Sequence, residues 1–136
     1  TYNHDSRIGV LVEVNCETDF VARTDDFAEL VKDVSMHIAA ASPEFVSSED
    51  IPATIRDEKK KEFTEKAKSE GKPDNMLENI VEGMLKKHFA EKCLLDQPFI
   101  KNPDQTVGQL VKDANARMGE NIVVRRFSRI ALGEVA

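Results

Sequence analysis

The sequence predicts an α+β fold: a small antiparallel sheet covered on one face by helices, with a helical hairpin in the middle of the chain. Segments rich in β-branched residues lie near both ends of the 136-residue chain. Apolar residues recur at helical spacing between them, and Gly71-Lys72-Pro73 divides this helical region in two. Strands gathered at the ends, without regular strand–helix alternation, are typical of α+β proteins, and the length suits one domain.

The composition argues against several classes of protein. Hydrophobic residues make up 40% of the chain and charged residues 32%, which suits a globular domain with a modest core. The net charge of −6 argues against direct nucleic-acid binding, because phosphate neutralisation needs clustered Lys and Arg. No apolar run approaches the ~20 residues of a membrane span. Cys16 and Cys93 lie too far apart to indicate a disulfide framework, so we expect a reducing compartment.

The N-terminal part is predicted to contain a hairpin and a helix. The hairpin covers residues 2–15, with its turn at His4-Asp5-Ser6. Its second strand has one wholly apolar face, as expected for a strand covered on one side: Ile8, Val10, Val12 and Val14. Either Thr18 or Thr24 could cap the amphipathic helix that follows, and Ser42-Pro43 ends this helix.

The middle of the chain is predicted to form two antiparallel helices. Residues 54–70 read as a highly charged helix with a thin apolar stripe, and Gly71 ends it. A second helix, with a broader apolar face, starts at Pro73. The short connection between the two predicts a helical hairpin.

The C-terminal part is predicted to contain a turn, a short helix and a long strand. Residues 97–100 are expected to be extended, and residues 102–104 to turn the chain. Thr106 then caps a short helix that Gly119 closes. Residues 121–132, rich in Ile, Val and Phe, form the closing strand.

A carboxylate and a large aromatic stand together in the polar segment after the first apolar strand. Two interpretations of Asp19 and Phe20 are open. In the first, which spacing alone favours, Asp19 caps a helix and Phe20 packs its first turn onto the core. In the second, Phe20 projects outward as an anchor that becomes buried on binding a partner, since aromatic residues are typical hot spots.

We predict no metal site, no cofactor and no catalytic residues, and therefore no enzyme. His4, Cys16, Glu17 and Asp19 lack the paired spacing of a zinc site. A catalytic Cys16 would need a positioned histidine and an electropositive setting, but Glu17 stands beside it. His37 and His88 fall on or beside apolar helical stripes and are interpreted as packing residues. No phosphate-binding loop of the nucleotide-hydrolase type is present.

Basic residues surround Phe127 in the closing strand, at residues 125–129. This strand could bind RNA, because aromatic side chains on an open sheet stack on bases. The alternative is ordinary strand alternation, in which Arg125, Arg126 and Arg129 cover the sheet and pair with the surplus acidic residues. The acidic chain favours this alternative.

The eleven residues 13–23, Glu-Val-Asn-Cys-Glu-Thr-Asp-Phe-Val-Ala-Arg, resemble the signature of the elongation factor Ts family. Other segments look like later parts of the same family, so that the likeness covers nearly the whole chain: residues 7–15, 48–52, 94–100, 106–110 and 120–127. One departure is Asp5-Ser6, which stands where family members often carry glycines.

The resemblance implies a guanine-nucleotide exchange factor that binds elongation factor Tu and promotes GDP release during translation elongation, without chemistry of its own. The matching Asp19 and Phe20 are then the tip that intrudes into the GTPase domain of elongation factor Tu, near its magnesium and phosphate site. Thr18, Val21 and Ala22 shape this tip. The resemblance reverses the weighting from spacing alone and favours an outward-pointing Phe20.

The resemblance also implies a domain organisation. Residues 1–136 are expected to be a single core, or dimerisation, domain, with the family's N-terminal helical domain missing before Tyr2. The chain starts at Thr1 and not at Met, so we expect an upstream segment to have been removed or left out. Compact family members restore a pair of modules by dimerising, so we expect a homodimer through the sheet. The expected location is the bacterial cytoplasm, or the stroma or matrix of an organelle.

Overall fold

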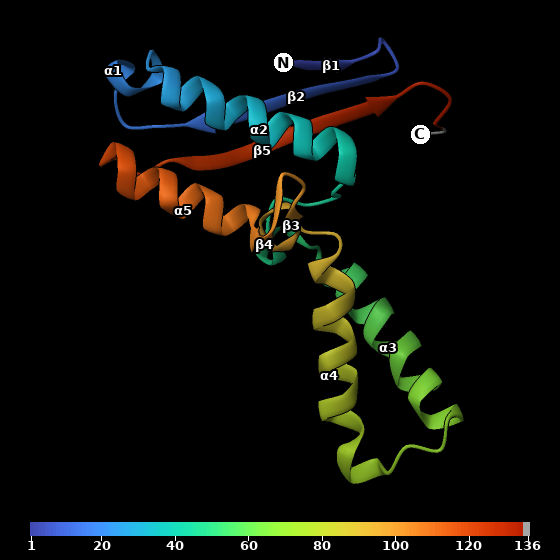
Figure 1. Ribbon diagram of the computed structural model, residues 1–136. Helices are drawn as coiled ribbons and strands as arrows, with labels where there is room; N and C mark the ends of the chain where they lie inside the picture. Colours follow the sequence, from blue (N-terminus) through green and yellow to red (C-terminus); the bar gives the residue numbers. More distant parts are fainter. Residues whose placement is uncertain (135–136) are drawn as a thin grey trace.

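A three-stranded antiparallel sheet joins the two ends of the chain. The computed structural model describes residues 1–134. In it, β2 (Ile8–Asn15) is the central strand, between β1 (Tyr2–His4) and β5 (Val123–Ala131). Helices α2 (Asp25–Ala41) and α5 (Val107–Met118) form the layer that packs on this sheet (Figure 1). The predicted α+β fold is confirmed.

The β1–β2 turn holds two non-glycine residues in left-handed backbone. Asp5 has a φ of 52° and Ser6 a φ of 56°, a conformation that glycine or asparagine adopts more readily in tight hairpins. The backbone N–H of Ser6 donates to Asn3 Oδ1 over 2.8 Å, and that of Arg7 donates to the His4 carbonyl over 2.9 Å. These bonds stabilise the turn that the sequence predicts here.

The register between β2 and β5 turns the apolar face of β2 towards the helices. Val10 lies opposite Arg129 and Val12 opposite Phe127, and a bulge at Arg125 shifts the pairing beyond Glu13. The main core lies between this face and the helical layer. Its buried members include Val10, Leu30, Val34, Ile38, Val107, Val111, Ala114 and Val124.

Both threonines that the sequence offers as helix caps are used, because a short helix, α1 (Asp19–Ala22), precedes α2. The Thr18 side chain caps α1 and accepts a hydrogen bond from the Val21 N–H. The Thr24 side chain caps α2 and accepts one from the Phe27 N–H. Ser42, with a φ of 52°, ends α2 where the sequence predicts.

The predicted helical hairpin projects away from the sheet (Figure 1). It consists of α3 (Ala53–Ser69) and α4 (Asp74–Ala90), preceded by the short helix η1 (Ser48–Asp50). A second, smaller core fixes its base to the rest of the chain, and its members are Phe45, Ile51, Ile55, Leu85, Phe89 and Cys93. His88, half-buried, contacts Phe63 and Phe89 edge-on, which confirms that it is a packing residue.

The predicted turn at residues 102–104 is wrong. After the short helix η2 (Leu94–Asp96), strand β3 (Pro98–Phe99) turns at residues 100–101 into β4 (Asn102–Thr106). The sequence predicts a turn here because Pro103 is typical of turns. Pro103 is tolerated in β4 because this two-stranded ribbon leaves the outer edge of each strand free of backbone partners.

His37 is fully buried and links three separate segments of the chain. Its Nδ1 accepts the N–H of Ile100 over 3.3 Å, so the neutral ring carries its proton on Nε2 and donates it to Gln97 Oε1 over 3.0 Å. Gln97 in turn donates to the Glu91 carbonyl over 2.8 Å. Burial lowers the pKa of His37, which keeps the ring neutral. The interpretation of His37 as a packing residue is confirmed.

Two glycines provide a matched test of the packing of α5 against η2. A Cβ at Gly108 would lie 2.9 Å from the Leu95 carbonyl oxygen, whereas a Cβ at Gly83, in α4, would meet nothing within 4 Å. Gly108→Ala should therefore lower the free energy of unfolding by about 1–3 kcal/mol. Gly83→Ala should raise it by about 0.5–1 kcal/mol, because alanine favours helix. Urea unfolding measures both, and a stabilising Gly108→Ala would contradict the close approach.

Candidate functional site

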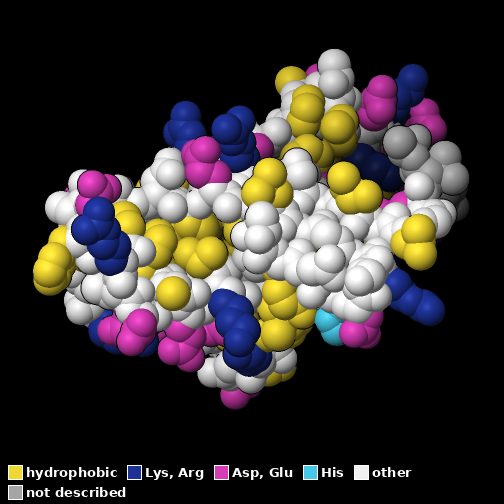
Figure 2. Space-filling view, turned by 90° about the horizontal axis from the view of Figure 1, so that it is seen from above, with side chains coloured by type: hydrophobic (Ala, Val, Ile, Leu, Met, Phe, Trp, Pro, Cys, Tyr) yellow, Lys and Arg dark blue, Asp and Glu magenta, His cyan; other side chains and the backbone are white. Residues whose placement is uncertain are grey.

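The turn that follows β2 carries the most exposed aromatic side chain of the described residues. The chain leaves β2 at Asn15, turns through residues 16–18 and enters α1 at one end of the sheet (Figure 1). Hydrophobic side chains reach the surface at this end of the molecule (Figure 2). We name residues 18–22, Thr18, Asp19, Phe20, Val21 and Ala22, the tip.

Adjacent residues of the tip differ sharply in burial. Phe20 is 82% exposed, whereas Val21 is 7% exposed and belongs to the main core. Thr18, Asp19 and Ala22 are exposed as well. The interpretation in which Phe20 packs onto the core is therefore wrong, because Val21 occupies the inward position of this short helix. The structure places four of the five predicted site residues at the surface, and the fifth beneath them.

Asp19 is not the helix cap that one interpretation of the sequence expects. Thr18 holds the cap position, and Asp19 is the first residue of α1. A carboxylate in the first turn interacts favourably with the partial positive charge of the helix N-terminus. Asp19 thus has a local stabilising partner while it stays open to solvent.

Glu120, in the turn between α5 and β5, holds the start of the tip. Its Oε1 accepts the backbone N–H of Glu17 over 3.1 Å and that of Thr18 over 3.0 Å, and its Oε2 accepts the Thr18 hydroxyl over 2.6 Å. Sequence reasoning missed this residue. Glu17 and Glu120 are 103 positions apart, and no local pattern connects them.

The residues that the sequence analysis weighed and rejected as a metal or nucleophile set, His4, Cys16, Glu17 and Asp19, do not all lie together. His4 lies at the far end of β2 from Cys16, since His4 pairs with Ile8 at the start of that strand. The Cys16 thiol donates to the Thr18 carbonyl over 3.3 Å. Among residues 1–134, no three His, Cys, Asp or Glu side chains form a group that could hold a metal ion.

Two of the three arginines of β5, Arg126 and Arg129, have partners within the chain. Arg126 pairs with Glu13 across the sheet at 3.3 Å, and Arg129 donates to the Ala39 carbonyl and to Glu134. Phe127 is half-buried against the main core. Ordinary strand alternation therefore accounts for this cluster better than a base-stacking platform, which needs an exposed ring.

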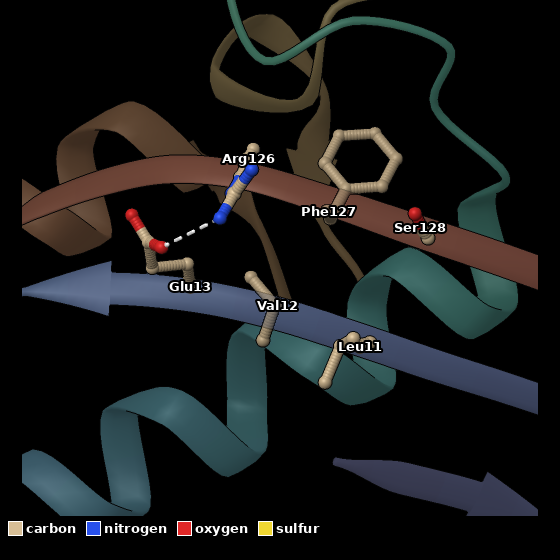
Figure 3. A pocket seen from close by; sticks show the side chains of 6 residues that line it. All are labelled: Leu11, Val12, Glu13, Arg126, Phe127 and Ser128. Carbon is tan, nitrogen blue, oxygen red and sulfur yellow. Dashed lines mark hydrogen bonds and ion pairs between the residues drawn. The ribbon is translucent and has the colours of Figure 1, made fainter.

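The outer face of the sheet, opposite the helices, carries exposed apolar side chains next to the Glu13–Arg126 ion pair. Leu11 in β2 is 62% and Ile130 in β5 76% exposed, and Leu132, directly after the end of β5, is 79% exposed. We name these three residues the outer apolar face. Beside them a shallow hollow of about 430 Å³ lies over β2 and β5. Figure 3 shows the side chains that line it: Leu11, Val12, Glu13, Arg126, Phe127 and Ser128.

None of the helices within residues 1–134 has the length and apolar character to cross a membrane.

Truncation of two neighbours should separate the exposed from the buried part of the tip. Phe20→Ala should change the free energy of unfolding by less than about 0.5 kcal/mol, because the ring is already in water. Val21→Ala should lower it by about 2 kcal/mol, because it leaves a cavity in the core. Thermal and urea unfolding measure both values. A large loss of stability in Phe20→Ala would mean that the ring packs in the core after all.

Comparison with known proteins gives the family. The model of the family described as "Elongation factor TS" matches residues 1–134. The chain is 57% identical over 128 residues to elongation factor Ts of Heliobacterium modesticaldum, a match that covers 94% of this chain and 60% of the relative. It is 53% identical over 128 residues to that of Geobacter sulfurreducens, which covers 94% of this chain and 59% of the relative. The chain thus spans about 60% of the length of these relatives. It belongs to the elongation factor Ts family.

Proposed function

We propose that this chain acts in translation as a guanine-nucleotide exchange factor, which binds elongation factor Tu and promotes the release of GDP. The observation that supports this most is the 82% exposed Phe20, held on a short, capped helix within a chain of the elongation factor Ts family. Aromatic side chains that become buried when a partner binds are typical hot spots of protein interfaces. The place of action is wherever elongation factor Tu works.

Exchange needs differential binding and no covalent chemistry. A factor that binds the nucleotide-free GTPase more tightly than the nucleotide-bound form weakens nucleotide binding to the same degree, by linkage. A hundredfold effect requires about 2.7 kcal/mol of differential contact. Burial of the Phe20 ring in a gap between GTPase helices supplies free energy of that order, about 2–3 kcal/mol. One side chain can thus account for most of the effect.

Asp19 adds an electrostatic component to the same contact. It precedes Phe20 in α1 and is exposed. A carboxylate brought near bound phosphates repels them, and it competes for their magnesium ion. Thr18 and Ala22 are exposed and lie within two residues of Phe20 in the chain, and Val21 fixes the helix to the core beneath it. Four of the five tip residues are thus proposed to contact elongation factor Tu, and the fifth, Val21, holds the helix on the core.

Removal of the Phe20 ring should abolish most of the exchange activity while the fold survives. Release of a fluorescent GDP analogue from elongation factor Tu, followed by stopped flow, measures this. Phe20→Ala should lower the maximal release rate by about tenfold to a hundredfold, in proportion to the lost contact. Met76→Ala is the matched control, since it truncates an exposed apolar side chain in α4, away from the tip. Unchanged release with Phe20→Ala would sink the proposed mechanism.

We also propose that two copies of the chain associate through the outer apolar face. A two-fold axis that lies in the plane of the interface, parallel to this face, would bring the same side chains of both copies together, as isologous dimers require. Leu11 from β2 and Ile130 from β5 lie on one side of the sheet, because Leu11 pairs with Ser128 and Gly9 with Ile130. The Glu13–Arg126 pair adds a polar rim.

A charge on this face should separate the two copies. Ile130→Asp should shift the wild-type dimer to a monomer by sedimentation or light scattering, because the dimer would bury an unpaired carboxylate. Met76→Asp, which places the same charge in α4, should leave the dimer intact. The helical circular dichroism should stay unchanged in both variants. A wild-type protein that is monomeric at tens of micromolar would contradict the proposed dimer.

A further inference from the structure

The start of the tip is fixed by a carboxylate from the other end of the chain. Glu120 accepts three hydrogen bonds, two from the backbone N–H groups of Glu17 and Thr18 and one from the Thr18 hydroxyl. Hydrogen bonds to an ionised acceptor are stronger than neutral ones. All three bonds fall on the two residues that immediately precede α1, so Glu120 acts on the entry to the helix that carries Phe20.

The Thr18 hydroxyl couples Glu120 to the helix itself. A hydroxyl has one proton, and here that proton points to Glu120 Oε2 over 2.6 Å. A lone pair of the same oxygen is thereby left for the N–H of Val21, which it accepts over 3.3 Å. Removal of the Glu120 carboxylate would free the hydroxyl to rotate, and the bond that caps α1 would lose its fixed direction.

Glu120 completes a capping box that the local sequence leaves open. In the usual box, the third helical residue is Glu or Gln, and its side chain accepts the backbone N–H of the cap residue. In α1 this position is Val21, which has no acceptor. Glu120 accepts the Thr18 N–H instead, from 102 residues away. A helix of four residues has little stability of its own, so it depends on such outside contacts.

These hydrogen bonds restrict the conformations of the tip more than they raise the free energy of unfolding of the domain. Glu17 and Thr18 are exposed, so water can satisfy their N–H groups when the carboxylate is removed. The core beneath is held independently by Val21, and the Thr24 hydroxyl donates to the Val21 carbonyl over 2.7 Å. Loss of Glu120 should therefore leave the fold intact and widen the range of positions that Phe20 samples.

We infer that Glu120 is a positioning residue for nucleotide exchange, one that holds the Phe20-bearing helix in its binding-competent conformation. This inference rests on the exchange function proposed above. When the tip is binding-competent for only a fraction of the time, the apparent dissociation constant equals the intrinsic constant divided by that fraction, so it rises. Glu120 should therefore determine the concentration of this chain at which nucleotide release is half-maximal. Phe20 should determine the maximal rate of release.

The test is a titration of the exchange factor in the stopped-flow release of a fluorescent GDP analogue from elongation factor Tu. Glu120→Ala should raise the half-saturating concentration about tenfold and leave the plateau rate unchanged. Glu120→Gln, which keeps one acceptor oxygen for the backbone N–H groups, should raise it less. Glu62→Ala removes an exposed carboxylate from a pair with Lys59 on α3; it controls for net charge and should have no effect.

A structural measurement on the same variants does not depend on exchange. Hydrogen–deuterium exchange should be faster at the amides of Glu17 and Thr18 in Glu120→Ala than in wild type or Glu62→Ala, with the melting temperature little changed. Thr18→Val, which removes the hydroxyl, should show less than additive effects with Glu120→Ala, because both act through one contact.

The outcomes separate this inference from the proposed function. Wild-type protein that fails to accelerate release contradicts the exchange function itself. Wild-type acceleration with a half-saturating concentration unaffected by Glu120→Ala overturns the positioning role alone. A fall in plateau rate without a change in half-saturation, or unchanged protection of the Glu17 and Thr18 amides, overturns it as well.

Discussion

The pairing of β2 with β5 is the contact on which the rest of the structure depends. It joins Ile8 to Ala131 and Asn15 to Val123, and so brings the two ends of the chain together along their whole length. Such distant pairing has a large closure cost, and the core must offset it. The inner face of the two strands meets α2 and α5 to form that core. The same pairing sets the turn after β2 against the turn before β5, where Glu120 meets Thr18.

The exposed Phe20 ring lies between two residues of the tip that are fixed to the rest of the domain. Thr18 is bonded to Glu120 before the ring, and Val21 is buried after it. Successive residues of a helix point about 100° apart, so a buried Val21 directs its neighbour Phe20 outward. An anchor that is already ordered loses less conformational entropy on binding. This arrangement therefore suits a binding contact in which the Phe20 ring is exposed and held in a fixed orientation.

Local patterns account for most of the fold, and contacts between distant segments account for what they miss. The apolar face of β2, the two threonine caps and the glycine at the hairpin are each readable within a few residues. Spacing alone favoured a buried Phe20, because the inward position of a four-residue helix cannot be assigned without knowing where it docks. The resemblance to a family corrected that preference. Glu120 could not be found at all, because its partners are set by the β2–β5 register.

The two proposed contacts use different parts of the same pair of strands. The outer apolar face lies on the side of the sheet away from the helices, whereas the tip extends from the end of β2 (Figure 1). Association of two copies through that face therefore leaves Phe20 accessible. The face is centred where Gly9 pairs with Ile130 and Leu11 with Ser128, whereas the tip follows the pairing of Asn15 with Val123 at the other end of the two strands.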